Sequence, residues 1–123
     1  MADPIFAIDT RPSLPRRGAT IELLVTVLQP RRAKQTEVGI RCREWFQQAD
    51  DRDNLDWVHK TVHHQREGLP AGAGDGSVRF TIPGEAPFTY EGSSVRYRWE
   101  AYAARSLRLR PDLREVVVFD VRL

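Results

Sequence analysis

The stretch from Phe80 to Tyr102, FTIPGEAPFTYEGSSVRYRWEAY, decides the fold. Its two ends are rich in β-branched and aromatic residues, but its middle carries two prolines and two glycines. Pro83 has no N–H to donate to a sheet, so we expect the first strand to end there. Pro87 holds Ala86 in an extended conformation. Nine residues, 84–92, are too many for a tight turn, so we expect this connection to cross from one sheet to another.

Apolar and polar residues alternate along most of the chain, which is typical of half-buried strands. The pattern predicts strands within 4–9, 20–27, 36–46, 54–67, 77–82, 95–104 and 115–123. In the segment 54–67, either Leu55 with Trp57 or Val58 with Val62 could face the core. Turn-forming segments separate the strands, and no segment shows a helical period. The sequence therefore predicts an all-β protein, a single immunoglobulin-like antiparallel β-sandwich domain of about seven strands spanning 1–123.

The same alternation predicts which side chains share the core. Cys42 alternates with the inward residues Val38 and Ile40, so we expect a buried, reduced thiol. The remaining strands contribute a larger set of inward residues: Val78, Phe80, Ile82, Val95, Tyr97, Trp99, Val117, Phe119 and Val121.

The composition narrows the classes of function. Hydrophobic residues make up 41% and charged residues 29% of the 123 residues, which is typical of a globular protein. The formal net charge of +2 is too small to predict nucleic-acid binding. No apolar run approaches the roughly 20 residues that span a bilayer. A single cysteine and no visible secretory signal predict a cytoplasmic protein.

The residues of the opening stretch resemble those of the arrestin-like β-sandwich family, which includes arrestins and bacterial sporulation-control proteins. The resemblance rests on the strand ending in IP (82–83), the AP of the crossover (86–87), TYEG (89–92) and VRYRWEAYA (95–103). It implies an arrestin-like sandwich and, for function, a non-enzymatic adaptor that binds other proteins. A typical arrestin has two such sandwiches, whereas this chain has the length for one.

No motif in the sequence predicts catalysis, a metal or a cofactor. His59 and His63, at i and i+4 on one expected strand face, would lie about 13 Å apart, too far for one metal ion. The segment DDRDNLD (50–56) lacks the glycine of a calcium loop, and GLPAGAGDG (68–76) lacks the lysine of a phosphate-binding loop. We therefore expect no enzyme, no metal and no cofactor.

Two groups of residues are candidates for binding a partner. In an antiparallel run of strands, alternate loops emerge at the same end, so the loops QPRRAK and RSLRLRPDLR should come together. Large aromatic residues that are exposed would add contacts, because aromatics anchor interfaces. The candidates are Arg31, Arg32, Lys34, Arg105, Arg108, Arg110, Arg114, Trp45 and Tyr102.

The favoured function is a non-catalytic adaptor or scaffold module, a subunit of a larger assembly that binds an acidic protein segment or another copy of itself. Exposed edge strands could add partner strands, which would also allow oligomers. The alternatives are a self-assembling structural protein and a β-sandwich that binds a small ligand such as a carbohydrate.

Overall fold

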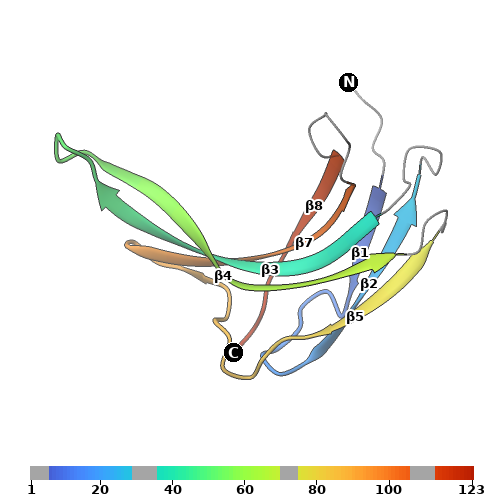
Figure 1. Cartoon of the computed structure of the whole chain (residues 1–123). Helices are drawn as coiled ribbons and strands as arrows, with labels where there is room; N and C mark the ends of the chain where they lie inside the picture. Colours follow the sequence, from blue (N-terminus) through green and yellow to red (C-terminus); the bar gives the residue numbers. More distant parts are fainter. Residues whose placement is uncertain (1–5, 29–35, 70–74, 106–112) are drawn as a thin grey trace.

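The computed structural model describes residues 6–28, 36–69, 75–105 and 113–123, and within them the protein is all β (Figure 1). The predicted fold class is confirmed: two antiparallel sheets pack face to face as a sandwich. The strands are β1 (Phe6–Arg11), β2 (Thr20–Val27), β3 (Thr36–Ala49), β4 (Leu55–Leu69), β5 (Gly76–Thr81), β6 (Tyr90–Glu91), β7 (Val95–Arg105) and β8 (Leu113–Phe119). These residues contain no helix long and apolar enough to cross a membrane.

The two sheets differ in size. One has three strands in the order β1-β2-β5; the other, called here the long sheet, has the order β4-β3-β7, with β6 and β8 both pairing with β7. β6 pairs with the start of β7 at Arg96 and Tyr97, and β8 pairs with the later part from Trp99 to Arg105. The crossover from β5 to β7 changes sheets, as the two prolines predict. β3 and β4 have 14 and 15 residues, and their hairpin projects well beyond the shorter sheet (Figure 1).

The core lies between the sheets and contains most of the residues expected there. Trp99 and Ile82 are completely buried, and Val78, Phe80, Phe119 and Val121 are buried with them. The other expected core residues, Val95, Tyr97 and Val117, are only half-buried. Val95 and Tyr97 begin β7, where the long sheet extends past the three-stranded one, so they lack a full covering layer (Figure 1).

Trp99 connects the core to the crossover. Its Nε1–H donates a hydrogen bond to the carbonyl oxygen of Pro87 at 2.9 Å. Two residues further on, Thr89 is joined to the last strand: its N–H donates to Val121 O at 2.8 Å, and its Oγ1 accepts from Val121 N at 2.7 Å. The segment 84–92 is therefore held by the core on one side and by the C-terminal residues on the other.

A β-bulge changes the expected pattern of β4. Cys42 on β3 pairs with His63 and Arg43 with Thr61, so Val62 is an extra residue. The expectation that His59 and His63 share a face is therefore wrong, because the extra residue reverses the alternation between them. Neither expected pair of inward residues on β4 is buried; Leu55 is 62% and Val62 38% exposed.

Replacing Trp99 tests its two contributions separately. Trp99→Phe keeps most of the ring but leaves Pro87 O without its donor, so we expect a loss of about 1–3 kcal/mol in the free energy of unfolding. Trp99→Ala also creates a cavity, and we expect a loss of about 3–5 kcal/mol. Urea unfolding measures both, and the half-buried Trp57→Phe serves as a control that should cost about 0.5 kcal/mol or less. A Phe variant as stable as the wild type would show that the hydrogen bond to Pro87 contributes nothing.

Cys42 should be unreactive in the native protein. Its side chain is completely buried, and burial, with a smaller effect of the Glu44 charge, raises the pKa of the thiol to about 12. Because the thiolate is the reactive form, a thiol reagent should label Cys42 only after denaturation. Rapid labelling of the folded protein would contradict this burial.

Candidate interaction surface

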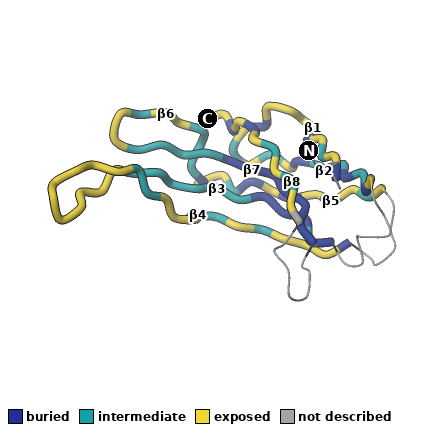
Figure 2. Tube along the Cα trace, turned by 90° about the horizontal axis from the view of Figure 1, so that it is seen from above, coloured by how far each residue is buried: buried dark blue, intermediate teal, exposed yellow. Residues whose placement is uncertain are grey.

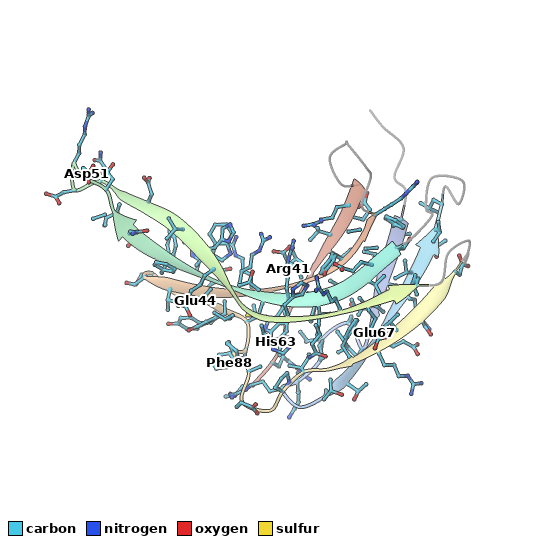
Figure 3. All side chains as sticks on the ribbon, in the orientation of Figure 1. Arg41, Glu44, Asp51, His63, Glu67 and Phe88 are labelled. Atoms are coloured by element: carbon cyan, nitrogen blue, oxygen red, sulfur yellow. The ribbon has the colours of Figure 1, made fainter. Side chains whose placement is uncertain are left out.

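Arginine and aromatic side chains gather on the face of the long sheet that points away from the three-stranded sheet, called here the outer face. Figure 3 shows Arg41 on this side and His63 and Phe88 on the other. The registers of β3, β4, β7 and β8 bring the outward positions together, because side chains on paired strands at the same register share a face. The outer face comprises Glu37, Arg41, Arg43, Trp45, Trp57, His59, His64, Arg66, Glu91, Arg96, Arg98, Glu100, Tyr102, Arg114, Val116 and Val118.

Glu100 lies at the centre of this face between two arginines. Its carboxylate contacts Arg41 Nη2 at 3.0 Å and Arg43 Nη1 at 3.5 Å, and the Glu100 and Arg41 side chains are only 12% and 11% exposed. Charges this buried require a partner, so Glu100 is what keeps both guanidinium groups in place. The Nε atoms of Arg41 and Arg43 are also buried and find no hydrogen-bond partner in the described part of the chain.

A second network surrounds Tyr102 at the β8 side of the face. The Tyr102 hydroxyl donates to Glu37 Oε2 at 2.8 Å and lies 2.6 Å from His64 Nε2. Because the single hydroxyl proton goes to Glu37, His64 Nε2 must donate to the tyrosine oxygen. The guanidinium carbons of Arg41 and Arg114 lie 5.1 and 5.5 Å from the centre of the Tyr102 ring. These contacts cover the ring, which is 1% exposed.

Burial controls the protonation of this network. It raises the pKa of Tyr102 to about 12, and the hydrogen bond to Glu37 acts in the same direction. Burial lowers the pKa of His64, and the Glu37 charge opposes that change only in part. The network therefore holds a neutral phenol and favours a neutral imidazole near pH 7, and the positive charge of this region comes from its arginines.

Gly39 makes room for the Tyr102 ring. The two residues pair across β3 and β7, and a Cβ atom at Gly39 would lie 2.5 Å from Gln65 O and 2.8 Å from the Tyr102 ring. Only a residue without a side chain fits between this ring and the backbone of β4.

Two tryptophans and two arginines form the other half of the outer face. The Arg96 guanidinium carbon lies 4.0 Å from the centre of the Trp57 ring, and that of Arg98 lies 5.7 Å from Trp45. Glu91 on β6 forms ion pairs with both arginines, with its oxygens 3.3 Å from Arg96 Nε and 2.9 Å from Arg98 Nε, and it accepts a hydrogen bond from Arg98. The hydrogen bond from Arg98 lowers the pKa of Glu91. The arginines therefore lie against aromatic rings in a fixed arrangement while remaining 34% and 41% exposed.

The structure brings only part of the predicted binding set together. Trp45 and Arg114 lie on the outer face, Trp45 half-buried and Arg114 exposed. Tyr102 lies there too, but it is buried beneath arginines. The sequence analysis made it a contact candidate only if it was exposed, so that condition is not met. Arg105 is 7% exposed at the end of β7. The loop residues Arg31, Arg32, Lys34, Arg108 and Arg110 lie outside the described residues, and their role stays a prediction.

The central arginines and Glu100 were missed by the sequence analysis. Arg41 and Arg43, like Arg96 and Arg98, occupy alternate positions on the polar side of their strands, which is a usable signal. What joins the two pairs is the register of β3 with β7, where Arg43 pairs with Arg98 and Arg41 with Glu100. Local alternation predicts the face of each strand but not that register.

The opposite side of the long sheet has an open hollow where it extends past the three-stranded sheet. Its volume is about 340 Å³, and its lining includes Phe88, Tyr90, Tyr97, Glu85 and Arg17. Arg17 lies with its guanidinium carbon 5.9 Å from the centre of the Phe88 ring. The hollow is thus mainly apolar, with three aromatic rings in its lining and one charged residue of each sign.

Gly39→Ala should disturb the Tyr102 network and the sheet beneath it. The added methyl group meets the backbone of β4 and the Tyr102 ring, so we expect a loss of about 1–3 kcal/mol in the free energy of unfolding. The exposed Gly68 on β4 has open space at its Cβ position, and Gly68→Ala is the matched control. Chemical unfolding of the two variants measures the difference, and equal stabilities would contradict the close approach at Gly39.

Comparison with known proteins agrees with this architecture. No family model and no curated protein matches the sequence. Among solved structures, the chain is similar to the crystal structure of Spo0M, a sporulation control protein from Bacillus subtilis, with a TM-score of 0.59 and 13% sequence identity. The match covers 98% of this chain and 51% of that protein, so the chain spans about half of its length. At this identity the likeness shows the fold alone, a β-sandwich that is similar to the fold of that sporulation control protein.

Proposed function

We propose that this chain is a non-catalytic protein-binding module, an adaptor or scaffold subunit, and that its outer face binds an acidic protein segment. One observation carries the proposal. Arginines are held against tryptophan and tyrosine rings by glutamate partners, on a sheet face over which no other described layer packs.

The composition of the outer face supports protein binding. Arginine, tryptophan and tyrosine dominate the energetic centres of protein interfaces, because they combine large contact area with directed hydrogen bonds. Exposed apolar residues border the arginines: Val116 is 39% and Val118 66% exposed, opposite Tyr102 and Glu100 in the register of β7 with β8. Such a mixture of apolar and charged groups is typical of interfaces that form and separate.

The charge of the outer face favours an acidic partner. Six arginines face three glutamates there, so the face is positive even with its internal ion pairs formed. A carboxylate arriving from a partner would find guanidinium groups already oriented, which reduces the entropy lost on binding.

The edge of β4 adds a second means of attachment. In the described part of the long sheet β4 pairs only with β3, so its other edge offers backbone donors and acceptors to a partner strand. The bulge at Val62 interrupts that edge, and charged residues such as Lys60 and Arg66 lie along it, which disfavours unspecific pairing. We therefore assign the edge a supporting role beside the outer face.

The fold supports a regulatory rather than a catalytic module. The similar solved structure is described as a sporulation control protein, and this chain corresponds to about half of it. A second candidate function, binding of a small ligand, is favoured by the aromatic hollow beside Phe88, whose volume of about 340 Å³ is at the lower end for ligand sites.

An acidic peptide tests the proposal. A fluorescent peptide of alternating glutamate and leucine should bind the wild-type protein, with an affinity that falls as salt rises from about 0.1 M to 1 M and the Debye length shortens from about 10 to 3 Å. Arg96→Glu combined with Arg98→Glu should weaken binding by at least about tenfold, because it reverses two charges on the outer face. Fluorescence anisotropy measures both effects.

The three-stranded sheet provides a matched control. Arg11 and Arg79 there are also exposed and ion-paired, to Asp9 and Glu22. Arg11→Glu with Arg79→Glu makes the same change in net charge and should leave peptide binding within about twofold of the wild type. Equal losses in the two double variants, or binding indifferent to salt, would show that the outer face is not the site.

A further inference from the structure

The tip of the β3–β4 hairpin is ordered but unsupported. All ten residues from Gln47 to Asp56 are exposed, and Figure 2 shows the end of the β3–β4 hairpin as an exposed loop far from the buried core. The turn is nevertheless well formed: the Asp50 carboxylate accepts hydrogen bonds from Arg52 N at 2.8 Å and Asn54 N at 2.9 Å. A two-stranded hairpin by itself is marginally stable in water, so a projection of this length is better explained if another surface covers it.

The tip is opposite in charge to the outer face. It carries Asp50, Asp51, Asp53 and Asp56 against one basic residue, Arg52, and in the middle of these charges Leu55 is 62% exposed. The outer face presents the converse mixture, an excess of arginine bordered by the exposed Val116 and Val118. The tip thus has the acidic and apolar character that the outer face is proposed to bind.

The tip cannot reach the outer face of its own chain. Both belong to the same sheet, and β3 runs without a break from Thr36 under the face to Ala49 at the tip. Folding the tip back would break the β3–β4 pairing between these points. Contact between tip and face therefore requires two copies of the chain.

We propose that the outer face binds the hairpin tip of a second copy, and that the two copies do so reciprocally in a two-fold symmetric dimer. The long sheet is bent along its length, with Arg41 on the side toward which the hairpin curves, so the outer face is concave and the tip projects (Figures 1 and 3). If each copy's tip binds the other copy's face, both sites are occupied and the assembly stops at two copies. If the tip of each copy instead bound the face of a further copy, the chain of contacts could continue into a fibre. This inference rests on the proposed function, since it names the acidic segment that the face binds.

Charge exchange between two variants tests the dimer. In the tip variant, Asp51→Arg and Asp56→Arg make the tip basic; in the face variant, Arg96→Glu and Arg98→Glu make the face acidic. Each variant alone should dissociate at least about tenfold more readily than the wild type, because both contacts of its dimer become repulsive. Mixed in equal amounts, they should form a heterodimer, because the basic tip of one variant meets the acidic face of the other and the one remaining contact joins an unmodified tip to an unmodified face.

Sedimentation velocity over a range of concentrations, at about 0.1 M and 1 M salt, measures these equilibria. We expect a wild-type dimer that weakens at high salt, a control variant (Arg11→Glu with Arg79→Glu) that dimerises as the wild type does, and restored association only in the mixture. Circular dichroism and thermal unfolding check that each variant is folded. A wild-type monomer at low salt and high concentration, a dimer unaffected by the tip variant, or a mixture that stays monomeric would each overturn the dimer. If the acidic peptide still binds the outer face in that case, the proposed function stands and only its assignment to a second copy fails.

Discussion

The hydrogen bond from Trp99 to Pro87 is the constraint on which the other features depend. A completely buried indole N–H needs an acceptor, and the crossover between the sheets supplies one, the carbonyl oxygen of Pro87 at 2.9 Å. Because Pro87 is held by this bond, the position of Thr89, two residues further on, is set as well. Thr89 in turn holds Val121 through two hydrogen bonds. One side chain in the middle of β7 therefore determines where the chain passes from one sheet to the other and where its last residues lie.

The same strand also organises the outer face. The neighbours of Trp99 are Arg98 and Glu100, whose side chains point away from the core by the alternation of the strand. Because the core holds Trp99 on the inner face of the sheet, the next residue, Glu100, is held on the outer face, between Arg41 and Arg43. The ordered charges of the outer face are thus a consequence of the packing of the inner one.

Stability alone does not explain so many charges on one sheet face. Apolar residues in place of a half-buried arginine–glutamate group are often as stable or more stable, because the group loses hydration. An arrangement already held in place loses less entropy on binding than mobile side chains do, which is the advantage that a binding surface would gain. Neutral His64 and Tyr102 fit this view, since they order Glu37 without adding charge.

The sequence predicted what depends on neighbouring residues and failed where distant strands had to be aligned. The alternation along most of the chain was sufficient for the sandwich and for the burial of Trp99, and the prolines at 83 and 87 were sufficient for the crossover. The bulge at Val62 has no signature in the residues around it, so the faces of His59 and His63 were misassigned. The tight fit of Gly39 under Tyr102 depends on the pairing of residues far apart in the chain, and so does the joining of Arg41 and Arg43 to Glu100.

The unequal lengths of the two sheets explain where the hollow and the projecting hairpin lie. Strands of six to eight residues in the smaller sheet cannot cover strands of 14 and 15 residues in the larger one. The uncovered end leaves the aromatic hollow beside Phe88 on one side and the free hairpin on the other. Because β3 carries Arg41 and Arg43 near its middle and leads into an acidic turn, positive and negative surface lie on one rigid element and cannot neutralise each other within the chain. The two surfaces of opposite charge therefore both remain exposed on one sheet, which is the distribution that the proposed contact between two copies requires.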